Sequence, residues 1–282
     1  MQWDCHMHMV LDGCDWRAAL ARHADAPLDS YIHRVLEQYQ KAGFTYLRDG
    51  GDRWGVGKRA RELATQYSIT YVTPLAPLCK KGHYGAFIGT AWESLKEYAA
   101  LVVKTRENGG DFIKIMISGL MDFDRFGVLT EAGLDPREIK ELVHIAHSEG
   151  MAVMAHANGS DTVLAAAEAG VDSVEHGAYL REDALWAMKE AGTVWVPTIS
   201  TVANLRNKGR FHEAAVERIL ENVMENVAFF ARFGGSVAPG SDAGAWQVFH
   251  AGVTEQALLQ QCGVSEAMQE QAARAIQERF QR

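Results

Sequence analysis

Two histidines near the start of the chain are spaced for binding one metal ion. His6 and His8 lie in the stretch Asp4-Cys5-His6-Met7-His8. Along a β-strand, residues i and i+2 point to the same face, so the two imidazoles would face one ion together. Imidazole nitrogen is a common ligand of zinc. The pair alone is weak evidence, because many such pairs are structural or occur by chance.

Four further candidate ligands accompany separate predicted strands. Each stands in or directly after a short run that is rich in branched residues and bounded by turn residues, which is typical of a buried strand. Their shared position at strand ends predicts that they meet at one site. A structural role for the lysine is costly, because a lysine between Ile113 and Ile115 needs a partner when buried. The four are Lys114 in the run 112–117, His156 at the end of 151–156, His176 after 171–175, and Asp242 after 236–241.

The composition is that of a globular protein with ordinary charge. The chain has 282 residues, of which 48% are hydrophobic, which suffices for one barrel of roughly 250 residues or for two smaller domains. A net charge of −8 without basic blocks argues against nucleic acid or an anionic membrane as a partner. The four cysteines lack the paired spacing of a disulfide framework or a zinc knuckle. We find no signal peptide and no bilayer-spanning apolar run, and therefore expect a cytoplasmic protein.

Strand and helix patterns alternate along the whole chain. This alternation predicts an α/β protein, a (β/α)8 TIM barrel formed by residues 1–282 as a single domain. A doubly wound open sheet is the alternative, but it predicts a glycine-rich turn after the first strand. Several helices carry start and stop signals, such as Asp135 before Pro136 and Gly150 at the end of that helix. The strands are predicted at about 2–7, 44–49, 69–76, 112–117, 151–156, 171–176, 193–198 and 236–241, and the helices at 31–41, 58–66, 91–105, 136–149, 160–169, 182–190, 213–233, 254–261 and 265–280.

These residues resemble the metal-dependent amidohydrolase superfamily, and in particular its imidazolonepropionase-like and prolidase-like branch. The resemblance covers essentially the whole chain. Relatives usually carry a small β-sandwich built from segments before the first strand and after the eighth. This chain opens on the first strand and has about 40 residues after Asp242, so we expect a barrel without the accessory sandwich. The matching motifs are Asp4-Cys5-His6-Met7-His8, Asp111-Phe112-Ile113-Lys114-Ile115, Val153-Met154-Ala155-His156-Ala157-Asn158-Gly159, Val174-Glu175-His176-Gly177, Val196-Pro197-Thr198 and Ser241-Asp242-Ala243-Gly244.

The resemblance implies two divalent metal ions, expected to be Zn²⁺. Lys114 would bridge them as an N-carboxylated lysine, since a carbamate offers two anionic oxygens. The nucleophile would be a metal-bridging hydroxide, and Asp242 would pass its proton to the leaving amine. The implied reaction is hydrolysis of a C–N bond in a peptide, an N-acyl amino acid or a cyclic amide. The implied ligands are His6, His8 and Asp242 for one ion, His156 and His176 for the other, and Lys114 for both.

Four residues in predicted loops are candidates for contact with a small-molecule substrate. His83 follows the third predicted strand, where relatives carry a Gly-His that contacts substrate. We predict that it is catalytic, binding a carboxylate or stabilising an oxyanion, although a plain loop histidine is the alternative. Tyr84 beside it is predicted to bind substrate, as are Arg206 after the seventh strand and Trp246 after the eighth.

Other functions stay open at this point. A mononuclear deaminase of an aminated heterocycle would lack the lysine and use a glutamate near a ligand histidine. Glu175 directly precedes His176, so strand alternation predicts that it points away from the site, and Lys114 favours the hydrolase. Lactone or ester hydrolysis shares the chemistry of amide hydrolysis, and a non-catalytic barrel is the remote alternative. Asn158 stands close to where acyl-amino-acid-cleaving relatives carry a tyrosine, which argues against a dipeptidase.

The last predicted helix bears an apolar stripe that needs a cover. The stripe packs on the barrel's own helices or is buried between subunits, since large exposed apolar patches are rare on soluble monomers. Without a sandwich to shield the barrel, we expect a homo-oligomer, most simply a symmetric dimer. The stripe consists of Met268, Ala272, Ala273, Ile276 and Phe280 at roughly helical spacing.

Overall fold

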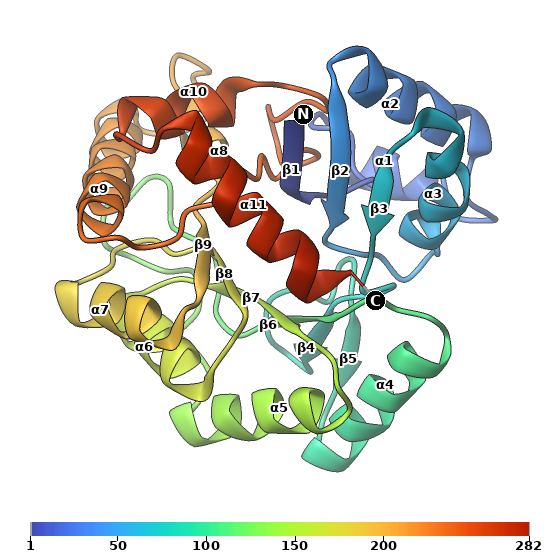
Figure 1. The fold of residues 1–282 in the computed structure, drawn as a ribbon, viewed down its shortest axis with the longest axis horizontal. Helices are drawn as coiled ribbons and strands as arrows, with labels where there is room; N and C mark the ends of the chain where they lie inside the picture. Colours follow the sequence, from blue (N-terminus) through green and yellow to red (C-terminus); the bar gives the residue numbers. More distant parts are fainter. Residues whose placement is uncertain (1, 282) are drawn as a thin grey trace.

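Parallel strands surrounded by helices form the body of the molecule (Figure 1). The computed structural model describes residues 2–281. One sheet has the order β1-β2-β3, and the other has the order β5-β4-β6-β7-β8-β9, with only parallel pairings between these strands. The chain therefore has the predicted α/β fold with parallel sheets. The strands are β1 Gln2–Met7, β2 Phe44–Asp49, β3 Thr70–Val72, β4 Leu78–Lys80, β5 Thr90–Trp92, β6 Ile113–Met116, β7 Val153–Ala157, β8 Ser173–His176 and β9 Val194–Val196.

The predicted eighth strand is an irregular segment that lies between β9 and β1. A parallel bridge joins Val237 to Trp195 on one side, and the Cys5 amide donates to the carbonyl of Pro239 at 2.8 Å on the other. Proline has no amide hydrogen to donate to a neighbouring strand, which explains why the pairing is not continuous. The segment 236–243 thus connects the edges of the two sheets without forming a full strand.

Helices follow most of the strands and surround them in Figure 1. The helix predicted from residue 91 begins instead at Leu95, because residues 90–92 pair with β4. The short helices α1 and α8 carry too few turns for a periodic pattern and were not predicted. The helices are α1 Trp16–Ala21, α2 Asp29–Lys41, α3 Val56–Ala64, η1 Thr65–Tyr67, α4 Leu95–Glu107, α5 Pro136–Ser148, α6 Ser160–Ala169, α7 Glu182–Ala191, α8 Ser200–Ala203, α9 Glu213–Arg232, α10 Thr254–Gln261 and α11 Glu266–Phe280.

Among residues 2–281, no helix combines the length and the apolar character needed to cross a bilayer.

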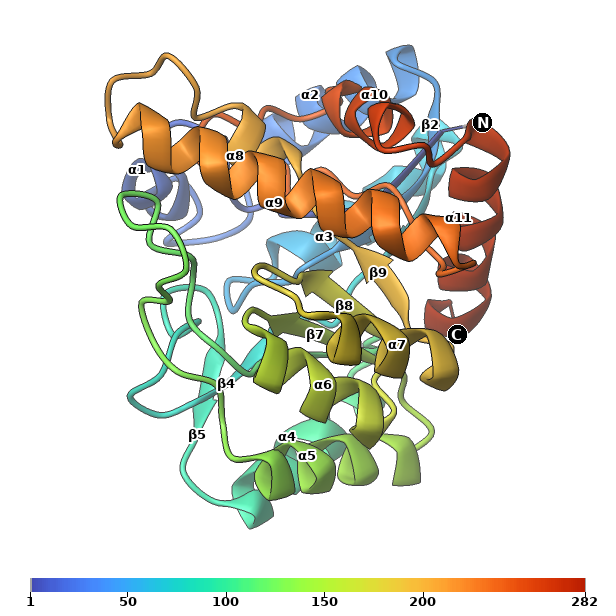
Figure 2. The ribbon, with the colours of Figure 1, turned by 90° about the vertical axis from the view of Figure 1, so that its left-hand side faces the viewer.

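The last helix, α11, crosses in front of the strands in Figure 1, on the side opposite the long loops that follow β6 and α8 in Figure 2. Its apolar stripe packs on the chain itself. Phe280 is fully buried and its ring meets that of Phe112 edge-on, with centroids 5.2 Å apart. Ala273 and Ile276 are equally buried in the same cluster. The stripe therefore gives no support to a subunit interface, and the homo-oligomer stays a prediction.

Truncation of Phe280 tests how firmly α11 is held. We expect Phe280→Ala to lower the free energy of unfolding by about 3–5 kcal/mol, because the lost ring leaves a cavity next to β6. Urea unfolding followed by circular dichroism measures the change. The matched control is Phe249→Ala, whose side chain is 54% exposed and should change stability by less than about 0.5 kcal/mol. Equal stabilities for the two variants would show that α11 does not depend on this contact.

Candidate metal centre

The six predicted ligands lie together on one cavity of about 920 Å³. They come from different strands or strand ends, as the parallel arrangement requires. Residues of the loops after β6 and α8 line the cavity, and these loops lie on the side of the molecule away from α11 in Figure 2. The ligand residues lining it are His6 in β1, His8 directly after β1, Lys114 in β6, His156 in β7, His176 at the end of β8, and Asp242 after the irregular segment.

His6, His8 and Asp242 form a close triangle. The two Nε2 atoms are 3.4 Å apart, and Asp242 Oδ1 lies 3.5 Å from His6 Nε2 and 3.4 Å from His8 Nε2. Two ligand atoms that are each about 2.1 Å from a tetrahedral ion stand roughly 3.4 Å apart. The three atoms are therefore spaced as the ligands of a single metal ion.

Unusual backbone angles turn two ligands toward the cavity. His176 has a φ of 69° and Asp242 a φ of 56°, both in the left-handed region. Such a conformation costs a non-glycine residue about 1–2 kcal/mol, and it ends the alternation of the strand. A tight contact also places His8, because a Cβ at Gly50 would lie 2.1 Å from its Cε1 atom. Glycine at position 50 therefore leaves room for this imidazole.

The second pair of histidines lies beside the first triangle. The ring centroids of His156 and His176 are 4.6 Å apart, and that of His6 is 5.1 Å from His176. His156 Nε2 is 3.1 Å from the carbonyl of Gly119, and His176 Nδ1 is 2.8 Å from the hydroxyl of Thr198. A ring nitrogen held by an oxygen partner leaves the other nitrogen for a metal. His156 would therefore bind through Nδ1 and His176 through Nε2.

Lys114 carries a buried amine in the middle of these ligands. Its side chain is 1% exposed, and Nζ makes no hydrogen bond to any of residues 2–281. Burial lowers the pKa of Lys114 to about 8, although the carboxylates of Glu175 and Asp242 act to raise it. An amine with this pKa is neutral more often than an exposed lysine, and a neutral amine can react with carbon dioxide. An unpartnered buried amine thus fits a lysine that becomes a carbamate.

Burial also keeps the imidazoles neutral, which is the form that binds metals. It lowers the pKa of His8 and of His156 to about 3, and the positive charge of Lys114 adds to the effect. The pKa of His6 and of His176 also falls well below the usual value for the same main reason.

Aromatic side chains from several loops and from the start of α1 form the walls of the cavity. Trp16 and Phe87 meet with ring centroids 5.7 Å apart, and Phe123 meets Phe211 at 5.2 Å. Trp246 lines the same cavity, and its centroid is 6.1 Å from that of Phe211. The polar ligands therefore lie in a cavity with largely apolar walls, which is typical of a small-molecule site.

The four predicted substrate contacts do not all lie in this cavity. Tyr84 and Trp246 line it, and the Tyr84 ring lies 4.8 Å from that of His156. His83 is not among its lining residues, because the ring pairs with the carboxylate of Glu131. The catalytic role of His83 stays a prediction.

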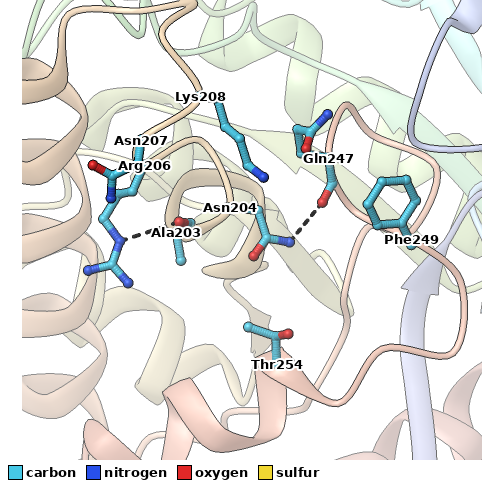
Figure 3. Close-up of a pocket in the computed structure, with 8 residues that line it drawn as sticks. All are labelled: Ala203, Asn204, Arg206, Asn207, Lys208, Gln247, Phe249 and Thr254. Carbon is cyan, nitrogen blue, oxygen red and sulfur yellow. Dashed lines mark hydrogen bonds between the residues drawn. The ribbon is translucent and has the colours of Figure 1, made fainter.

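Arg206 lines a second pocket of about 580 Å³ (Figure 3). Residues at the end of α8, in the loop that follows it, and in the range 247–254 form this pocket. Its Nε donates to the carbonyl of Ala203 at 3.4 Å. In the same pocket the Asn204 amide donates to the carbonyl of Gln247 at 3.0 Å. The structure thus places Arg206 apart from the metal ligands, and substrate binding by this residue stays a prediction.

Glu175 corrects the expectation drawn from strand alternation. Its carboxylate does not point away from the site, since Oε2 lies 2.8 Å from His6 Nδ1. Glu175 faces the interior between the strands, and the left-handed backbone of His176 turns that histidine into the cavity. Glu175 and its partner Arg48 are both fully buried. A charged residue within each of two apolar strands was the signal that could have predicted this pair.

Comparison with known proteins finds relatives that are similar in sequence and in fold. No family model matches the chain. Ochratoxinase of Aspergillus niger is 28% identical over an alignment of 234 residues, and the match covers 71% of this chain and 47% of that protein. An uncharacterized protein of Mycobacterium tuberculosis is 26% identical over 271 residues, 93% of this chain and 68% of that protein. The chain thus spans about half the length of the ochratoxinase that it matches.

Solved structures show the same fold. A Xaa-Pro dipeptidase with bound methionine superposes with a TM-score of 0.76 at 22% identity, covering 99% of this chain and 74% of that one. The structure of A. niger ochratoxinase gives 0.72 at 22% identity, covering 97% and 68%. These likenesses show that the chain shares the fold of these proteins.

Proposed function

We propose that this chain is a metal-dependent hydrolase that cleaves an amide-like C–N bond in a small molecule. The observation that carries the proposal is the unpartnered, buried amine of Lys114 among four neutral imidazoles and the carboxylate of Asp242. Packing of the hydrophobic core alone does not explain why these polar groups line the same cavity. Ochratoxinase, a Xaa-Pro dipeptidase and an amidohydrolase, to which the chain is similar, are named for hydrolytic reactions.

We also propose that the two sheets form a closed (β/α)8 barrel with the segment 236–243 as its eighth position. The bridges of that segment to β9 and β1 support closure on one side. On the other side, the Asp111 amide donates to the carbonyl of Thr73 at 2.9 Å, which links the end of β3 to the start of β6. In such a barrel the ends of the strands meet at one face, where the six ligands lie.

The donor set fits two zinc ions. The triangle of His6, His8 and Asp242 would hold one ion, and His156 with His176 would hold the other. Lys114, as a carbamate, would contribute an oxygen to each. Bound metals would supply Lewis-acid polarisation of the substrate carbonyl and a water of lowered pKa.

The protein's own groups would move the proton and orient the substrate. A carboxylate oxygen of Asp242 would accept the proton of the attacking water and return it to the leaving nitrogen. The aromatic walls favour an amide with a large apolar group, and they would exclude bulk water from the reacting carbonyl. Tyr84 and Trp246 would contact that group from opposite loops.

The deaminase alternative is disfavoured by the position of Glu175. A deaminase needs a carboxylate aimed at the substrate, but this one is engaged by Arg48 and His6 in the interior.

A screen of the zinc-loaded protein against N-acyl amino acids, dipeptides, hydantoin-like rings and lactones tests the proposed reaction class. We expect release of a free amine from at least one amide. Turnover confined to lactones, or to deamination of heterocycles, would contradict the proposal.

Metal stoichiometry tests the two-ion site. Protein supplied with zinc and bicarbonate should bind about two ions per chain, because six ligand groups lie together. Elemental analysis of the dialysed protein measures the ratio. A ratio of no more than one, with an unmodified Lys114 in a crystal structure, would contradict the binuclear site.

Substitution of Lys114 tests the carbamate. Lys114→Ala should abolish activity, and short carboxylic acids should restore part of it by replacing the carbamate oxygens. Lys114→Arg is the matched control, because arginine fills the space and cannot be carboxylated, so added acids should not restore turnover. Near-full turnover of Lys114→Ala without added acid would exclude a bridging role.

Asp242→Asn tests the proton transfer. We expect kcat to fall by at least about 10²-fold, because an amide cannot accept the proton and the residue is also a ligand. Circular dichroism and metal analysis would show whether the fold and the zinc content persist. An unchanged kcat with normal metal content would exclude Asp242 from the reaction.

A further inference from the structure

A continuous set of buried polar contacts runs from the last helix to a metal ligand. The guanidinium of Arg48 lies 4.4 Å from the centre of the Phe280 ring in α11. Its Nη2 atom is 2.9 Å from one Glu175 oxygen and 3.1 Å from the other. The second oxygen of Glu175 is in turn 2.8 Å from His6 Nδ1, an ion-pair distance, although Nδ1 makes no hydrogen bond of good geometry to any of residues 2–281. None of these three polar side chains is more than 1% exposed.

Further hydrogen bonds fix Arg48 and Glu175 in these positions. Arg48 Nε donates to the carbonyl of Cys5 at 2.6 Å, and Nη1 donates to the hydroxyl of Ser173 at 2.8 Å. The same hydroxyl donates to Glu175 Oε1 at 2.5 Å. These groups belong to three strands, with Cys5 in β1, Arg48 in β2, and Ser173 and Glu175 in β8. The carboxylate therefore cannot rotate without breaking several buried contacts, each costly to lose.

We propose that Glu175 is a positioning residue that fixes the ring and the tautomer of His6, with Arg48 as its anchor. The proposal rests on the proposed function insofar as His6 is a metal ligand. A carboxylate that is paired with a guanidinium accepts hydrogen bonds, so in this proposal the His6 ring turns its Nδ1 hydrogen to the nearby Glu175 oxygen. The lone pair is then on Nε2, which faces His8 and Asp242. An oriented imidazole of this kind is a stronger ligand, and loss of its carboxylate partner typically costs 10–100-fold in metal affinity.

A second buried glutamate provides a control that distinguishes the positioning of His6 from ordinary structural support. Glu255 is 1% exposed and accepts hydrogen bonds from the amides of Ile199 and Ser200. Among residues 2–281 its hydrogen bonds go to the start of α8 and not to the six predicted ligands, and it acts on one of them, Asp242, only through its charge, which raises the pKa of that residue. Glu255→Gln is therefore the matched control, because it removes a buried carboxylate of similar exposure from another part of the interior.

Zinc chloride titrated into the metal-free chain of 282 residues by calorimetry is the first measurement. Glu175→Gln should bind the first zinc ion about 10–100-fold more weakly than the unmodified chain, because the amide cannot replace both oxygen contacts. Glu255→Gln should stay within about threefold. Wild-type affinity in Glu175→Gln, or an equal loss in both variants, would overturn the proposal.

Long-range ¹H–¹⁵N spectra of the metal-free protein give a second measurement that needs no bound metal. The His6 ring, assigned by the signals lost in His6→Gln, should be protonated at Nδ1 in the unmodified chain and in Glu255→Gln. It should become a mixture of tautomers in Glu175→Gln. If the Glu175→Gln variant does not fold, the double variant Arg48→Met/Glu175→Leu removes both charges together and should show the same mixture.

The two measurements also separate failure of this inference from failure of the proposed function. Should the unmodified chain bind no zinc, the proposed function fails, while the His6 tautomer still reports on Glu175. A Nδ1-protonated His6 in every variant would overturn the positioning role whatever the zinc affinity.

Discussion

The pairing of Arg48 with Glu175 is the interaction on which the rest of the interior depends. Two full charges are taken out of water here, and their desolvation is repaid only because nearly every donor and acceptor has a partner. Those partners belong to β1, β2 and β8, so the pair fixes how these strands stand relative to one another. It also fixes His6, and through His6 the triangle of ligands above it. The pair thus connects the packing of these strands to the predicted ligands through one direct contact, that of Glu175 with His6.

Lys114 presents the opposite case in the same interior. Its amine is as deeply buried as Arg48 but has no hydrogen-bond partner among residues 2–281. Burying a polar amine without a hydrogen-bond partner costs free energy, which another interaction must offset. A strand that is buried on both faces has few groups that could provide such an interaction. The contrast between a fully satisfied arginine and an unsatisfied lysine argues that the lysine is completed by something other than protein. A carbamate between two metal ions would satisfy both the amine and the surrounding imidazoles.

The sequence was sufficient to predict those parts whose signal is local. Helix α5 follows from Asp135, Pro136 and Gly150, and its observed bounds agree to within a residue. That the six predicted ligands would line one cavity follows from their positions at strand ends, because parallel strands bring those ends together whatever the loops do. Other features depend on contacts that no local pattern carries. Strands β4 and β5 have three residues each, too few for alternation, and the direction of Glu175 depends on Arg48 from a distant strand.

The same distinction explains why the chemistry of the site is easier to infer than its substrate. Ligands on strands are held by backbone hydrogen bonds and by contacts beneath them, so their arrangement follows from the fold. The walls come from loops, where a single pairing can redirect a side chain, as the contact with Glu131 does for His83. Trp246 and Phe211 meet across two such loops, and each could be replaced without altering the strands below. One scaffold can therefore keep the residues on its strands while its loops change, and substrate choice must be measured on the chain itself.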